Sequence, residues 1–473
     1  MTSSHASASI RRWTLILTSI AAFMVTLDAL VVVTALPSIQ RDLGADISSL
    51  QWTVNAYTLA LAAGIVTAAA LGDRFGRRLV FTVGLVLFSA ASAACALAPT
   101  SSSLIAARTV QGLGAAIVTP LALTLLTEAF PPERRGTVVG VWGGLTGLAV
   151  AAGPLVGGGV TEGLDWHWIF WVNVPIGAVA TVFALTRLQE SRGPSTRLDP
   201  VGALLITVGA VALAWGLVRG NDSGWRSTEI IVALGVSAVL LLAFLAWESV
   251  ARAPMLPLGL FRIRPFAFAN ATGFLMFGSI FAAAFLMSQW FQFSLGYSPL
   301  ATGLRFLPWT ATPIVIAPLA GALSDRIGKR PLMAIGLLLQ GGGLAWIADH
   351  ATTTTGYVDL VLPLVVAGIG ISMAIPTTTT AAIGAVEPRD IGKASGVQNT
   401  LTRFGSVFAV AIATAVLTSN GHLGSPIGFT DGFRPALAVM ACLSALGGIA
   451  ALAVGGRPRL GVVEQPEPAV AVA

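Results

Sequence analysis

The sequence predicts an all-α protein that lies in a lipid bilayer, and three observations support this class. Hydrophobic residues make up 55% of the 473 residues, whereas charged residues make up only 10%. Soluble domains carry roughly 25% charged residues. The apolar residues are gathered into long stretches, and one charged loop sequence occurs twice. A water-soluble enzyme of this length could not bury so much apolar surface.

Fourteen stretches are long enough to cross a bilayer as helices, which takes about 20 mostly apolar residues. They are too long for the strands of a membrane barrel. Their approximate ranges are 13–36, 50–70, 79–98, 104–126, 137–160, 168–187, 199–218, 229–250, 266–290, 302–323, 332–349, 358–381, 395–418 and 434–455.

The distribution of basic residues predicts the orientation of these spans. With both termini in the cytoplasm and the spans alternating, twenty of the 27 basic residues fall on the cytoplasmic side and four on the outer side. This is the excess that the positive-inside rule describes. The net charge of +6 therefore reflects topology, and we expect no nucleic-acid partner.

The repeated charged loop divides the chain into halves. "AAALGDRFGRRLV" (68–80) resembles "GALSDRIGKRPLM" (321–333) when Asp73 is aligned with Asp325, an offset of 252 residues. Parallel repeats of this kind are typical of secondary transporters, whose substrate site lies between the halves. We therefore expect a six-helix bundle at 1–190, an inserted two-helix region at 191–261, a second six-helix bundle at 262–455 and a cytoplasmic tail at 456–473.

At the level of motifs, the chain resembles the major facilitator superfamily and, within it, the fourteen-span drug:proton antiporter family. The stretches that carry this resemblance are "LDALVVVTALPSI" (27–39), "LQWTVNAYTLALAAG" (50–64), "LIAARTVQGLGAA" (104–116), "WHWIFWVNVPIG" (166–177) and "FQFSLGYSPLATGLRFLP" (291–308). The resemblance implies a major facilitator fold, a monomer, and a conformational latch in the repeated loop. The latch residues would be Gly72, Asp73, Arg74, Gly76 and Arg77 in the first copy, and Asp325, Arg326, Gly328 and Lys329 in the second.

The fifth predicted span, residues 137–160, is rich in glycine, which allows close helix packing. It also contains a proline, which removes a backbone hydrogen-bond donor. By resemblance it is the motif of exporters, with matches at Gly140, Gly153, Pro154, Gly157 and Gly158. Ala149 and, in the loop, Ala69 stand where the family patterns have glycine.

Asp28 and Arg108 are the candidates for proton coupling. Asp28 lies about 15 residues into the first stretch, or roughly 20 Å from its cytoplasmic end. A carboxylate at that depth is costly unless it is paired or hydrated, and such residues mark proton pathways. Arg108 lies at a similar depth, so we expect the two to interact. The alternatives are a structural carboxylate and an arginine that reaches the membrane interface.

A further group of residues is predicted to line a substrate cavity. In the superfamily, the first and fourth helices of each half face the cavity, which favours the candidates of the ninth and twelfth stretches. Polar residues of the second and thirteenth stretches are further candidates. A lipid-facing aromatic stripe is the alternative for the phenylalanines, and a packing contact is the alternative for the arginine. The predicted residues are Asn55, Tyr57, Asn270, Phe274, Phe277, Phe281, Pro376 and Arg403.

The expected function follows from these features together. The nucleotide-binding pattern GxxxxGK[ST] is absent from the sequence, so energy should come from an ion gradient. We expect a bacterial inner (plasma) membrane antiporter, not an enzyme, that exports hydrophobic drugs, antibiotics or toxic small molecules in exchange for protons, with membrane lipid as its surroundings and without a cofactor or metal. The alternatives are a proton-coupled nutrient symporter and a membrane sensor that transports nothing.

Overall fold

The computed structural model describes residues 8–192, 199–251, 254, 258–386, 391–422 and 424–455, and every element in this part of the chain is helical. The first half contains α1 (Ala8–Leu43), α2 (Ile47–Phe75), α3 (Arg77–Ala96), α4 (Ser101–Ala129), α5 (Pro132–Gly163), α6 (Trp168–Trp171) and α7 (Asn173–Arg187). The central pair is α8 (Pro200–Ser223) and α9 (Thr228–Val250). The second half contains η1 (Leu258–Arg262), α10 (Arg264–Gln289), η2 (Trp290–Ser294), α11 (Pro299–Thr310), α12 (Thr312–Ile327), α13 (Lys329–His350), α14 (Tyr357–Ile383), α15 (Ile391–Asn420) and α16 (Pro426–Leu452).

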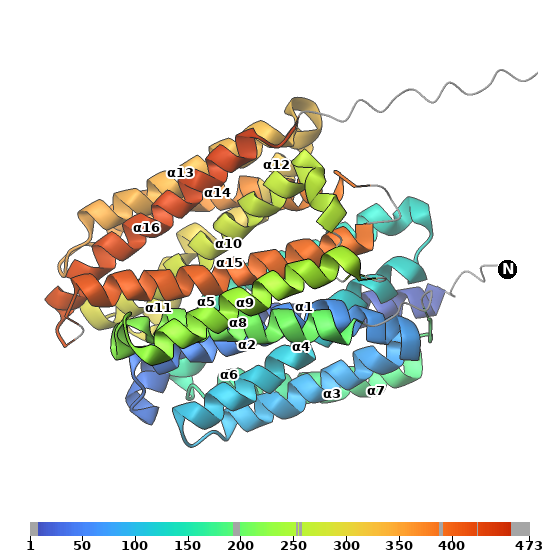
Figure 1. Ribbon diagram of the computed structural model, residues 1–473, viewed down its shortest axis with the longest axis horizontal. Coiled ribbons are helices and arrows are strands. Elements are labelled where there is room, and N and C mark those ends of the chain that lie inside the picture. Colours follow the sequence, from blue (N-terminus) through green and yellow to red (C-terminus); the bar gives the residue numbers. More distant parts are fainter. Residues whose placement is uncertain are drawn as a thin grey trace, which may run out of the picture.

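The long helices run side by side and form one elongated bundle (Figure 1). Within the described residues, eleven helical segments are long and apolar enough to cross a membrane, or twelve if α2, which is bent by 47°, is included. The helices α5 and α8 run beside them and are 32 and 24 residues long. An all-helical membrane bundle is therefore confirmed, and the count of fourteen spans stays a prediction.

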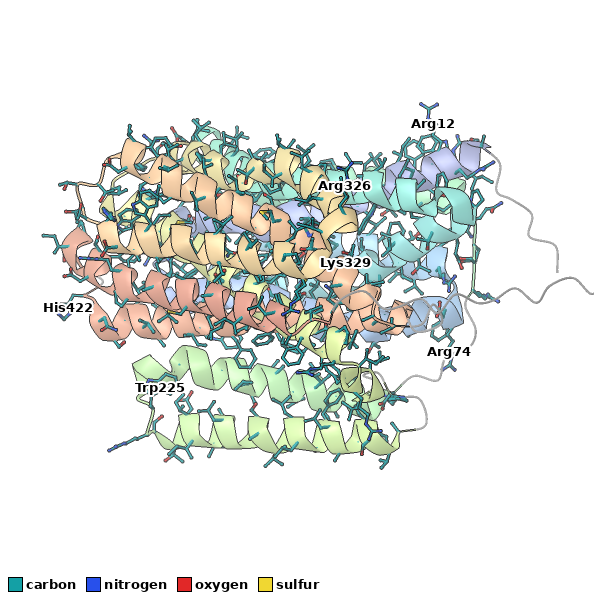
Figure 2. All side chains as sticks on the ribbon, turned by 90° about the horizontal axis from the view of Figure 1, so that it is seen from above. Arg12, Arg74, Trp225, Arg326, Lys329 and His422 are labelled. Carbon is teal, nitrogen blue, oxygen red and sulfur yellow. The ribbon has the colours of Figure 1, made fainter. Side chains whose placement is uncertain are left out.

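The two ends of the bundle differ in their side chains. Figure 2 places Arg12 and Arg74 at one end, which we call the Arg74 end, and Trp225 and His422 at the opposite end, which we call the Trp225 end. The helix α1 starts at the Arg74 end, and successive long helices run in opposite directions. The loops that follow α1, α3 and α5 therefore lie at the Trp225 end.

The central pair α8–α9 packs mainly on itself and forms a separate layer (Figure 2). The side of this pair that meets the bundle belongs to α8, which contacts α2 of the first half and α15 of the second half. The rings of Trp52 and Trp215 lie 5.8 Å apart at this contact. The pair therefore covers the seam between the halves on one side.

The halves are joined at the Trp225 end and separate towards the Arg74 end. One buried apolar cluster contains Leu36 and Trp166 of the first half together with Phe285 and Phe433 of the second half. A smaller buried cluster, with Leu59 of α2 and Phe404 of α15, joins the halves near the middle of these helices. Other clusters towards the Arg74 end contain residues of one half only, such as Leu121 and Leu188, or Phe266 and Ala394.

Hydrogen bonds between the halves add to the closure at the Trp225 end. Ser288 and Gln292 donate to the backbone carbonyls of Val33 and Thr34 at 2.9 Å each. The Glu162 carboxylate accepts from the backbone N–H of Leu300 at 2.9 Å. That N–H belongs to the first turn of α11, where a negative charge is favourable.

The glycine-rich helix α5 is held between α1 and α11. A Cβ atom at Gly157 would lie 2.6 Å from the carbonyl oxygen of Val31 on α1, and one at Gly158 would lie 2.2 Å from the carbonyl oxygen of Pro299 on α11. From the other side, a Cβ at Gly303 would lie 2.3 Å from the carbonyl oxygen of Pro154. The missing side chains therefore let the two halves touch backbone to backbone.

The contact between α5 and α11 gives the first prediction. Gly158→Ala places a methyl group against backbone that no rotamer change can move, and overpacking of this kind costs about 1–3 kcal/mol. We expect it to shift the population away from closure at the Trp225 end by about tenfold or more. Spin labels at the exposed positions Leu164 and Ile427 would report this as a longer distance across that end.

The matched control lies on the same helix. A Cβ at Gly163 would meet nothing within 4 Å, so Gly163→Ala should leave the distance distribution unchanged. Equal effects of the two substitutions would contradict the role assigned to this contact.

Candidate functional site

The centre of the first half contains a buried ion pair. Nη1 of Arg108 lies 2.5 Å from Oδ2 of Asp28, and both side chains are almost fully buried. The guanidinium lies over the Tyr57 ring, 4.1 Å from its centroid, and its Nε donates to the backbone carbonyl of Thr53 at 3.2 Å. The predicted interaction of Asp28 with Arg108 is thus present, and their role in proton coupling stays a prediction.

Three polar side chains complete the environment of this pair. Gln111 and Asn173 donate to Oδ1 of Asp28 at 2.8 and 3.0 Å, and both also donate to Oγ of Ser92. Nη1 of Arg108 also donates to Oε1 of Gln111 at 2.7 Å. Asp28, Ser92, Arg108, Gln111 and Asn173 form what we call the Asp28 network. Both carboxylate oxygens therefore accept hydrogen bonds, as a buried charge requires.

The local sequence explains why these side chains meet. Arg108 and Gln111 are three residues apart on α4, so they lie on one face of the helix. Asn173 begins α7, at the end of the stretch "WHWIFWVNVPIG". Gln111 and Asn173 lie inside motif stretches but were not predicted to contact Asp28. No pattern in the sequence points to Ser92.

The residues predicted to line a substrate cavity lie in several places. The buried Tyr57 belongs beside the Asp28 network, and its hydroxyl donates to the backbone carbonyl of Val25 at 3.2 Å. Asn55 is 1% exposed, and its amide has no hydrogen-bond partner in the described part of the chain. Asn270 donates to the backbone carbonyl of Phe266, while its Oδ1 has no partner there.

The three phenylalanines of α10 that were predicted to line the cavity, Phe274, Phe277 and Phe281, are half-buried. The Phe274 ring lies 5.8 Å from the Phe408 ring of α15, and Phe277 stacks on Phe281. Arg403 is on α15, and Pro376 is in α14. Their contribution to substrate binding stays a prediction.

The first copy of the repeated loop is fastened to its own half. Arg77 donates to the Asp73 carboxylate at 2.8 Å and also forms an ion pair with Glu128 at the end of α4. The Glu190 carboxylate accepts from the backbone N–H groups of Arg78 and Leu79, which open α3. The exposed Arg74 lies over the Phe75 ring, and the backbone of Gly72 lies against Leu121.

The second copy repeats this arrangement in part. Lys329, which corresponds to Arg77, donates to the backbone carbonyl of Thr380 at 2.8 Å. The same offset of 252 residues relates Thr380 to Glu128. Arg326 is exposed at the end of α12 (Figure 2). The side chain of Asp325 and the surroundings of Gly140 lie outside the described residues, and the latch role of the loop stays a prediction.

The sequence profile of the major facilitator superfamily matches residues 18–312 and 269–471. The chain therefore belongs to that superfamily. The multidrug resistance protein Stp of Mycobacterium tuberculosis is 36% identical over 86% of this chain and 76% of its own length. The tetracenomycin C resistance and export protein of Streptomyces glaucescens is 32% identical over 86% of this chain and 76% of its own.

A solved structure supports the fold independently of close sequence similarity. The partially occluded inward-open xylose transporter XylE of E. coli matches with a TM-score of 0.66 at 14% identity, over 93% of this chain and 97% of that chain. The protein is therefore a multi-pass membrane transporter by family, and the resemblance expected from its motifs is confirmed.

The Asp28 network gives the second prediction. Asp28→Asn leaves the Arg108 charge buried without a counter-charge, and removing one partner of a buried pair costs about 3–5 kcal/mol of stability. We expect a smaller loss in the double variant Asp28→Asn/Arg108→Gln, because both charges are then absent. Thermal unfolding of the purified variants in detergent measures the difference, and losses that simply add would contradict a direct interaction.

The repeated loop gives the third prediction. Gly76 and Gly328 have positive φ angles of 114° and 88°, so replacing either with alanine strains the backbone, by about 1–3 kcal/mol. A Cβ at Gly76 would also lie 2.7 Å from the Glu190 carboxyl carbon, whereas a Cβ at Gly328 would meet nothing within 4 Å. Gly76→Ala should therefore lower the melting temperature more than Gly328→Ala does, and the reverse order would contradict the role of Glu190 at the start of α3.

Proposed function

We propose that this protein exports hydrophobic small molecules, including antibiotics or other drugs, in exchange for protons by alternating access. The observation that carries the proposal is the Asp28–Arg108 pair, buried in a superfamily fold whose halves meet at one end and separate at the other. The names of the relatives, multidrug resistance and antibiotic export proteins, support the choice of cargo.

The orientation follows from the distribution of basic residues, with both termini in the cytoplasm and the Arg74 end facing inward. The arrangement described above is then closed to the outside of the plasma membrane and open to the cytoplasm. Opening to the outside requires the backbone contact between α5 and α11 to separate while contacts form at the Arg74 end. The repeated loops lie at that end and are suited to act as the latch there.

Asp28 supplies the site for the transported proton. Protonation removes the negative charge that Arg108 faces, so the guanidinium is left with neutral acceptors, Gln111 and the Thr53 carbonyl. The two protonation states therefore favour different arrangements of α1 and α4. Each proton that moves inward gains about 2.3 kcal/mol per 100 mV of membrane potential, so no nucleotide or other cofactor is needed. The transporter would work as a monomer.

Dye efflux from cells gives the fourth prediction. In a bacterial host without its own major pumps, expression should speed the efflux of a lipophilic fluorescent dye, and an uncoupler should abolish the gain. Asp28→Asn should abolish it as well, at equal expression. The control Asp349→Asn, at a carboxylate whose side chain is 76% exposed, should behave as the unchanged protein does. Efflux that persists with the uncoupler would rule out proton antiport.

A further inference from the structure

A groove on the outer flank of the first half is not accounted for by the Asp28 pair or by the contact between the halves. It has a volume of about 600 Å³ and lies between α5 and α7, with α1 as its floor. It forms because α5 and α7 both pack on α1, while α7 otherwise contacts α3 and α6. In Figure 1, α3 and α7 lie at the edge of the bundle furthest from α13 and α16 of the second half.

The rim of this groove faces the bilayer. Ile20, Leu145 and Ile176, on α1, α5 and α7, line it and are 38–39% exposed. The α7 wall lies at the edge of the bundle away from the second half (Figure 1), so the apolar side chains exposed on that wall contact lipid rather than the space between the halves. A molecule dissolved in the membrane can therefore reach the groove without passing through water.

One polar group in the groove has no partner. Ser19 lines it and is 5% exposed, and its hydroxyl has no hydrogen-bond partner among the described residues. The adjacent Thr18 satisfies its own hydroxyl on the Thr14 carbonyl at 2.7 Å, as helix hydroxyls commonly do. A buried hydroxyl without a partner costs free energy, which a ligand can recover by supplying the missing hydrogen bond.

The remaining polar groups of the groove are already occupied. Asp28 and Asn173 lie at its inner end, but Asp28 is neutralised by Arg108, and Asn173 donates to Asp28 and Ser92. A charged ligand would thus find no free counter-charge. An acyl chain of a phospholipid would fill apolar volume but would leave Ser19 without a partner. The volume is within the range of about 300–1,000 Å³ that drug-sized ligands use.

We propose that this groove is a binding site for uncharged hydrophobic small molecules that carry one hydrogen-bonding group and enter from the bilayer. Ser19 binds the polar group, and the apolar part extends along α1 towards Asp28, about 14 Å away by helix rise. The binding site is inferred from the side chains of the groove alone. Its use as the entry point for exported compounds rests on the proposed function.

Photolabelling tests the site with the protein in phosphatidylcholine nanodiscs. The probe is 3-azioctanol, an eight-carbon alcohol with a photoreactive diazirine, and adducts are located by mass spectrometry. We expect adducts on the groove face of α1 and α7 that excess octanol removes. Ser19→Ala should raise the half-maximal labelling concentration by about two- to tenfold, because it removes one neutral hydrogen bond to the probe.

A matched pair of variants on α7 separates the groove from general contact with lipid. Ile176→Trp fills the groove and should abolish its adducts, whereas Val179→Trp, at a position 56% exposed and outside the groove, should leave them unchanged. Equal labelling of the two variants, or an unchanged labelling concentration in Ser19→Ala, would overturn the proposal. So would a diazirine-labelled phosphatidylcholine that labels the groove and is not displaced by octanol, since the occupant would then be lipid.

These measurements use no ion gradient, so they are independent of transport. If dye efflux were insensitive to the uncoupler but the groove were labelled as described, the proton-antiport function would fail and the binding site would remain. If efflux depended on protons and the two tryptophan variants were labelled equally, the binding site would fail and the function would remain.

Discussion

The buried Asp28–Arg108 pair is the constraint on which the first half depends. Charges cannot remain in the interior of a membrane protein unless each has a partner and a full set of hydrogen bonds. Here those partners come from different helices: Asp28 from α1, Thr53 from α2, Ser92 from α3, Arg108 and Gln111 from α4, and Asn173 from α7. The hydrogen bonds around this one ion pair therefore connect five helices of the first half.

The contact between the halves has the opposite character. Beside the shared apolar side chains, its closest approach is backbone against backbone at Gly158 and Gly303, with few side-chain hydrogen bonds across it. Contacts of this kind gain from close packing but leave no buried charge behind when they open. The distribution suits a transporter whose halves move as bodies, since the glycine surfaces can part without exposing an unpaired buried charge.

The two halves are not equivalent, although their loops repeat. Arg77 forms ion pairs with Asp73 and Glu128, whereas the corresponding Lys329 donates to the Thr380 backbone carbonyl. At the Trp225 end, apolar residues of both halves form one cluster, and Glu162 of the first half accepts a hydrogen bond from Leu300 of the second. The repeat explains the architecture. The departures from it place the ion pairs of Arg77 and Arg108 in the first half.

The sequence predicted the helical bundle, the repeat and the interaction of Asp28 with Arg108, because depth in a span can be counted from the chain. It could not predict that Ser92 and Asn173 complete the network, since their approach depends on how α3 and α7 are rotated. It placed Tyr57 with the cavity residues, which stays a prediction, and it did not foresee that the Tyr57 ring packs against Arg108. The groove beside Ser19 was not foreseen, because it arises only when three helices pack together.

The direction of proton movement during transport distinguishes antiport from symport. The purified protein would be reconstituted into liposomes containing a pH-sensitive dye, with no initial gradient, and an exported compound would be added outside. Antiport predicts that the compound enters while protons leave, so that the lumen becomes alkaline, and that Asp28→Asn shows no such change. Acidification of the lumen would mean that compound and proton move together, and this result would contradict the account.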